Sequence, residues 1–165
     1  MSEDVERATQ QVFERLVEAG EAVAVGELSF VSVLELASGA RYGLLAGPRW
    51  AVLEGERLIP FAPGDEKAFV EALEYPRREF DDLLEAGARA RGFDGEAVMF
   101  TFPALELVQA MLVSGSPHFT RVALHWMRPT EIRAARAQLV AVTQNQLMAQ
   151  AVRQLAERLI VPSEG

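Results

Sequence analysis

The chain has 165 residues, of which 50% are hydrophobic and 24% are charged, so it is long enough and apolar enough to fold around a core. Its formal net charge of −8 disfavours nucleic-acid binding, because neutralising phosphates needs clustered lysine and arginine side chains. It contains no cysteine, which excludes disulfide bonds, zinc sites built on thiolates and cysteine nucleophiles.

The first third of the chain predicts a helix followed by a sheet. Ser2 is a suitable N-cap, and apolar residues then recur with helical spacing until Gly20. From residue 21 to 61 the spacing changes to alternation, interrupted by turns that contain glycine. This pattern predicts an antiparallel meander of five strands over residues 21–26, 28–37, 41–46, 49–54 and 57–61. In the tightest turn, Gly55 would place Glu54 opposite Arg57, a favourable cross-strand pair.

The remainder of the chain is predicted to be mostly helical. A short helix follows an Asp65 cap and runs through Leu73, and a second begins at Pro76 and continues to about residue 91. Residues 96–102 alternate and predict one later strand, with Val98, Phe100 and Phe102 on one face. Further helices are expected over 103–113, 117–128 and 130–160, the last with a break near the polar residues 143–146.

These elements predict a single α+β domain over residues 1–165. It consists of an N-terminal helix, an antiparallel β-meander of about five strands plus one later strand, and a helical C-terminal half. Residues 1–102 are expected to be mostly sheet with helices, and residues 103–165 to be entirely helical. The opening MSEDVER is acidic where a signal peptide would be basic, and no apolar run reaches the length of a membrane span. We therefore expect a cytoplasmic protein that does not enter the membrane.

The stretch SPHFTRVALHWMRP, residues 116–129, contains both histidines of the chain and is the main candidate site. Wound as a helix at about 100° per residue, it separates into two faces. The apolar face contains Phe119, Val122, Ala123 and Trp126. The polar face contains His118, Arg121, His125 and Arg128. This Arg/His stripe could bind carboxylates or phosphates of a partner and gain charge as the pH falls. The favoured interpretation is a solvated helix face, or one docked on the acidic part of the same chain, because charged runs on helices usually face water.

Catalytic and metal-binding interpretations of the same stretch are weaker. His118 and His125 are two helical turns apart, about 10 Å along the axis, which is too far for both to bind one metal ion. Ser116 precedes a proline, which is typical of an N-cap, although a small hydrolase using Ser116, His118 and His125 stays an alternative. The acidic segment REFDDLLE, 78–85, is interpreted as a surface helix with its phenylalanine and both leucines buried and with local arginine–aspartate pairs.

The sequence therefore predicts a non-enzymatic, cytoplasmic protein-binding domain: an adaptor, a chaperone or an immunity-type neutraliser. A small hydrolase and a nucleic-acid-associated regulator are the alternatives. No cofactor, metal, nucleic acid or membrane is expected as a partner. A homodimer is expected, because the C-terminal helices carry a long apolar seam with few charges. The seam consists of Ala137, Val140, Leu147, Ala151, Leu155 and Leu159.

Overall fold

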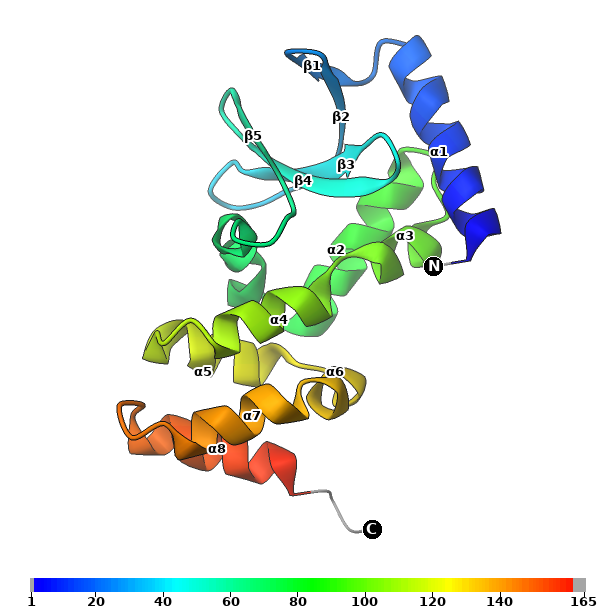
Figure 1. Cartoon of the computed structure of the whole chain (residues 1–165). Coiled ribbons are helices and arrows are strands. Elements are labelled where there is room, and N and C mark those ends of the chain that lie inside the picture. The colour runs from blue at the N-terminus through cyan, green and yellow to red at the C-terminus, as the bar shows by residue number, and fades with distance from the viewer. Residues whose placement is uncertain (1, 162–165) are drawn as a thin grey trace. The chain divides into compact units, whose positions relative to one another are not determined.

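A computed structural model describes residues 2–161, and contacts between Cα atoms divide the chain into two compact units. Unit 1 consists of Met1–Glu71 and Arg78–Phe102, and unit 2 consists of Ala72–Arg77 and Pro103–Gly165. The chain therefore passes between the units three times. The α+β class, with an initial helix, a five-stranded meander and a helical second half, is confirmed (Figure 1).

Unit 1 begins with helix α1, Glu3–Glu18. The Ser2 hydroxyl accepts a hydrogen bond from the main-chain N–H of Val5 at 3.4 Å, so the predicted N-cap is confirmed. Acidic residues fill the first turn, where they interact favourably with the helix dipole. The helix buries Phe13 and Leu16, which lie one turn apart, and leaves most of its other residues exposed to solvent.

The sheet follows as a strongly curved antiparallel meander in chain order (Figure 1). Its strands are β1 (Val23–Val25), β2 (Leu28–Glu35), β3 (Arg41–Leu45), β4 (Arg49–Glu54) and β5 (Arg57–Pro60). The tight turn between β4 and β5 is as the sequence predicts. Glu54 pairs with Arg57 across it, and Gly55 has a φ of 61°, in the left-handed region that glycine adopts without strain.

A β-bulge in β2 explains how the next helix packs so closely on the sheet. The register of β2 on β3 shifts between Ser32 and Leu34, which leaves Val33 as an extra residue and bends the strand. Helix α2, Arg77–Ala90, lies over this position: a Cβ at Gly87 would come within 2.0 Å of the Val33 carbonyl oxygen. Just after α2, Arg91 donates from its Nε to the Ser32 carbonyl oxygen at 3.0 Å. Glycine is therefore required where the helix meets the bulge.

Both faces of the sheet are covered within unit 1. On one face, a cluster of aromatic rings joins strands to helices, with Phe102 contacting Tyr42, Trp50, Phe69 and Phe80 at centroid distances of 5.1–6.4 Å. On the other face the curled sheet packs on itself. This second cluster consists of Phe30, Leu45, Ala51 and Leu53, with Val23, Val25 and Leu58 partly buried around it.

The prediction of a strand over residues 96–102 is wrong, because this segment forms helix α3, Gly95–Thr101. Asp94 caps the helix by accepting from the N–H of Ala97 at 3.1 Å. Val98 and Phe102, four residues apart, are buried, whereas Phe100 between them is 64% exposed. The burial follows helical spacing, so these three side chains do not share a face. The short helix after Asp65 forms as a 3₁₀ helix, η1, over Glu66–Glu74.

Unit 2 is built from helices. These are α4 (Ala104–Leu112), α5 (Pro117–Trp126), α6 (Pro129–Ala134), α7 (Arg136–Gln144) and α8 (Gln150–Ile160). Helix α4 packs along α5 and α7 packs along α8. The break expected near 143–146 falls between α7 and α8 at residues 145–149, and a second interruption separates α6 from α7 at Ala135. Among residues 2–161, no helix has the length and apolar character needed to cross a membrane.

The predicted seam of the C-terminal helices is only partly covered within the chain. Leu147 is 94% exposed, Ala137 and Ala151 are exposed, and Leu155 is half-buried. The core of this region is built from a neighbouring set: Leu139, Val142, Met148, Val152 and Ala156. The seam is therefore the outer apolar edge of α7 and α8, with its most prominent side chain in the loop between them.

Candidate functional site

The Arg/His stripe lies mainly on the outer face of α5. Ser116 caps this helix and Pro117 occupies its first turn, as the sequence predicts. His118, Arg121 and His125 are exposed, whereas Ala123 and Trp126 on the opposite side are buried. The predicted separation of a polar stripe from the buried Trp126 side is therefore present in the structure.

Arg128 is set apart from the other three members of the stripe. It is half-buried at the beginning of α6, where its main-chain N–H donates to the Glu131 Oε1 atom at 3.1 Å. The structure thus brings His118, Arg121 and His125 to one exposed helix face. Arg128 contributes to the start of the next helix instead.

Ser116, the nucleophile of the hydrolase alternative, has a structural role in the helix. Its hydroxyl accepts a hydrogen bond from the main-chain N–H of Phe119 at 3.2 Å. The ring of His118 lies beside the ring of Phe119, with 5.6 Å between their centroids. The hydrogen-bond partner of the hydroxyl is thus the helix backbone.

The acidic segment of α2 forms a helix, with two departures from the expected burial, one of which is that Asp81 is buried and only 6% exposed. Phe80 and Leu84 are fully buried, but Leu83 is 36% exposed. Glu85 forms an ion pair with Arg89 four residues later, which is a local pair but not one of the expected arginine–aspartate pairs. No group of three or more histidine, aspartate and glutamate side chains suited to a metal ion occurs in the described part of the chain.

Sequence reasoning missed a buried ion pair in unit 2. The guanidinium of Arg77 donates two hydrogen bonds to the Glu131 carboxylate, Nη1 to Oε1 at 2.6 Å and Nη2 to Oε2 at 2.8 Å. The two side chains are only 14% and 11% exposed, and the guanidinium lies 4.1 Å from the ring centroid of Trp126. Bidentate pairing and ring stacking are the geometry that arginine suits and lysine does not.

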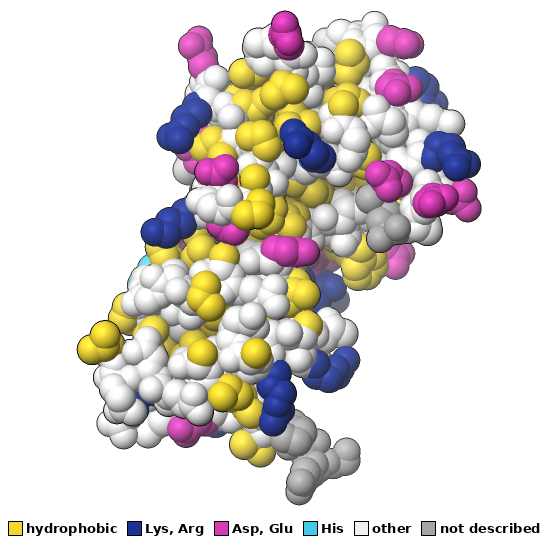
Figure 2. Space-filling model, viewed as in Figure 1, with side chains coloured by type: hydrophobic (Ala, Val, Ile, Leu, Met, Phe, Trp, Pro, Cys, Tyr) yellow, Lys and Arg dark blue, Asp and Glu magenta, His cyan; other side chains and the backbone are white. Residues whose placement is uncertain are grey.

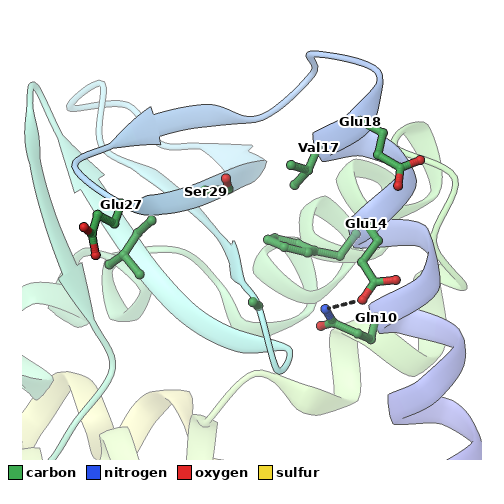
Figure 3. Close-up of a pocket in the computed structure, with 9 residues that line it drawn as sticks. Gln10, Glu14, Val17, Glu18, Glu27 and Ser29 are labelled. Carbon is green, nitrogen blue, oxygen red and sulfur yellow. Dashed lines mark hydrogen bonds between the residues drawn. The ribbon is translucent and has the colours of Figure 1, made fainter.

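A groove in unit 1, between α1 and the first part of β2, was also missed (Figure 3). Its volume is about 330 Å³. It is lined by Gln10, Phe13, Glu14, Val17, Glu18, Glu27, Leu28, Ser29 and Ala46. Val17 points from α1 towards the hairpin, and Glu27 lies across the groove from Glu14 and Glu18 (Figure 3). The groove therefore combines four apolar side chains with carboxylates on both sides.

The side chain of Gln10 fixes the relation between α1 and the sheet at this groove. Its Oε1 atom accepts from the main-chain N–H of Gly47 at 2.8 Å, and its Nε2 atom donates to the Glu14 Oε1 atom at 3.2 Å. One amide thus ties the helix to the turn between β3 and β4 and orients a carboxylate at the groove. The lining residues come from three separate segments, which is why periodicity within any one element could not reveal them.

Charge is divided unequally between the two units. Unit 1 contains 19 acidic and 9 basic residues, whereas unit 2 contains 5 acidic and 7 basic residues. On the face shown in Figure 2, carboxylates are frequent over unit 1, and unit 2 shows mainly uncharged and hydrophobic side chains with some arginine. The groove therefore belongs to the strongly acidic unit.

Comparison of the chain with protein-family models, curated proteins and solved structures found no match.

Proposed function

We propose that the chain is a non-enzymatic protein-binding domain that works in the cytoplasm as an adaptor, a chaperone or an immunity-type neutraliser. The observation that supports this is the groove between α1 and β2, where an apolar lining is combined with three carboxylates. Surfaces that bind proteins join apolar contact area to a polar edge in this way. The lining contains no lysine or arginine that would neutralise these carboxylates, which favours a partner that supplies cations.

Affinity purification of the tagged chain from its native cells tests this proposal. We expect a protein partner to be retained in a fixed ratio to the chain and to resist washing at moderate salt. A filter-binding titration at low salt examines the nucleic-acid alternative. Tight, salt-sensitive retention of DNA or RNA without a protein partner would overturn the proposal.

We also propose that the chain forms a homodimer through the helices of unit 2. Three large apolar side chains of this unit are left open to solvent: Leu147 is 94% exposed, and Val113 and Val161 are each 67% exposed. Leu155 and Leu159 of α8 are only half-buried. A second copy that covered the outer edge of α7 and α8 would remove Leu147, Leu155 and Leu159 from water.

The substitution Leu147→Glu is expected to convert a dimer into a soluble monomer. Because the side chain is 94% exposed within one chain, the change should not disturb folding, but it would place a charge in an apolar contact. Light scattering on purified protein at tens of micromolar measures the mass. Gln146→Glu, at the exposed neighbouring residue, adds the same charge and should leave the dimer intact. A monomer observed for the unmodified chain would contradict the proposal.

A further inference from the structure

We infer that the groove between α1 and β2 binds a basic amphipathic segment of a partner protein, an inference that rests on the proposed function. The segment would place apolar side chains in the groove and lysine or arginine side chains against its carboxylates. Three features of the groove lead to this partner chemistry: its apolar side chains, its carboxylates without ion pairs among the described residues, and the hydrogen bonds that fix helix α1 against the sheet.

One of the apolar side chains that line the groove is exposed to solvent. Leu28, at the start of β2, is 45% exposed, and Val17 on α1 is half-buried. Phe13 is buried beneath them. The volume of about 330 Å³ lies at the lower end of the range of about 300–1,000 Å³ for pockets that enclose small molecules. It suits a few apolar side chains of a docked segment.

The carboxylates at the groove have no cationic partner within the described chain. Glu14 and Glu18 are four residues apart on one face of α1, where like charges repel each other. Glu14 accepts only the Gln10 amide, and no ion pair involves Glu18 or Glu27 among residues 2–161. A partner that supplied cations from both sides would relieve this repulsion, whereas a phosphate backbone or an anionic membrane would increase it.

Hydrogen bonds and strand pairing fix the geometry of the groove in the free protein. The Gln10 amide links α1 to Gly47 and positions Glu14, so the carboxylate does not have to be ordered on binding. The first residues of β2 pair with β1 alone, with Val25 opposite Leu28, whereas pairing with β3 begins at Val31. The strand therefore leaves room beside Leu28 that β3 does not fill. Such preorganisation reduces the entropy cost of binding.

Synthetic peptides of leucine and lysine with helical periodicity provide the probe. Two matched peptides are compared with it: one with serine replacing every leucine and the same lysines, and one with glutamate replacing every lysine. Fluorescence anisotropy with labelled peptide and the full chain is expected to show saturable binding of the leucine–lysine peptide only. Equal binding of the serine–lysine peptide would overturn the inference, because the apolar side chains of the groove would then contribute nothing.

Variants of the chain locate the binding. Glu14→Gln, Glu18→Gln and Glu27→Gln together should weaken the leucine–lysine peptide about tenfold, since each exposed ion pair contributes modestly. The matched control neutralises three other exposed residues of unit 1: Glu35→Gln, Glu54→Gln and Glu56→Gln. Because both triple variants change the net charge equally, an equal loss in the control would overturn the inference in favour of general charge attraction.

The apolar contact is tested separately. Leu28→Ser should weaken the peptide about fivefold at any salt concentration, because burial of apolar surface is not screened by salt. Leu83→Ser changes a comparably exposed leucine of α2 that does not line the groove and should have no effect. If both substitutions weaken binding equally, the inference is wrong.

The failure of this inference is distinguishable from failure of the proposed function. If the native partner is captured equally by the unmodified chain and by the Glu14, Glu18 and Glu27 variant, the groove assignment is wrong but the protein-binding function stands. If no protein is captured by the unmodified chain, the proposed function itself fails. If the groove variant instead turns a dimer into a monomer in light scattering, the groove is occupied by a second copy of the chain and the inference is also overturned.

Discussion

Glu131→Ala is expected to lower the free energy of unfolding by about 3 kcal/mol or more. The change removes the carboxylate that holds both Nη atoms of Arg77 and leaves a guanidinium nearly enclosed in unit 2 without that counter-charge. Breaking a buried pair costs about 3–5 kcal/mol in other proteins, mostly through the charge left behind. Urea unfolding followed by far-ultraviolet circular dichroism measures the loss.

Two further variants show whether the loss of stability in Glu131→Ala is caused by the buried charge of Arg77. Replacing both partners, with Arg77→Met and Glu131→Leu, should restore much of the stability because no buried charge is left unpaired. Arg133→Ala, at an exposed residue of the same helix, should change the stability by less than about 0.5 kcal/mol. A double variant as unstable as the single variant would contradict this account.

Phe102→Ala is expected to destabilise the protein by about 3–5 kcal/mol, the usual cost of truncating a buried phenylalanine. Its ring is only 6% exposed and contacts Phe80 at 5.1 Å and Trp50 at 5.3 Å between centroids. The neighbouring substitution Phe100→Ala should cost less than about 0.5 kcal/mol, because that side chain is 64% exposed. Thermal or urea unfolding of the two variants side by side gives the comparison.

The same pair of variants separates a helix from a strand over residues 96–102. On a strand, Phe100 and Phe102 would lie on one face and both truncations would be costly. In the structure Phe100 lies on helix α3 and is exposed, whereas Phe102 is the C-cap and is buried, so one truncation is costly and the other is not. Similar losses for the two variants would contradict the helix.

The meander could be predicted because its determinants are local. Alternating apolar residues predict each strand, and a glycine predicts each tight turn to the next strand. The Glu54–Arg57 pair therefore follows from neighbouring residues. The segment 96–102 was assigned wrongly because its apolar residues fit a two-residue period as well as a helical one. The signal for the helix was Asp94, which caps α3, followed by Glu96 in the first turn.

The candidate sites could be predicted only in part, because periodicity reports on one element at a time. The Arg/His face of α5 is a property of one helix and follows from its periodicity. The Arg77–Glu131 pair joins residues 54 positions apart, and the groove is formed where α1 meets a hairpin and a turn. Leu147 looked like part of a continuous seam, but it lies in the loop between α7 and α8, where helical spacing no longer determines which side chains are covered.

The interleaving of the two units along the chain has a consequence for how the protein is made. The hexapeptide Ala72–Arg77 belongs to unit 2, yet it leaves the ribosome before the last segment of unit 1 and long before the helices it joins. Arg77 is synthesised 54 residues ahead of Glu131, an interval of roughly 3–10 s at about 5–20 residues per second. Throughout that time the guanidinium cannot form its two hydrogen bonds to the Glu131 carboxylate. Unit 2 therefore cannot fold completely on the nascent chain until its last helices have been synthesised.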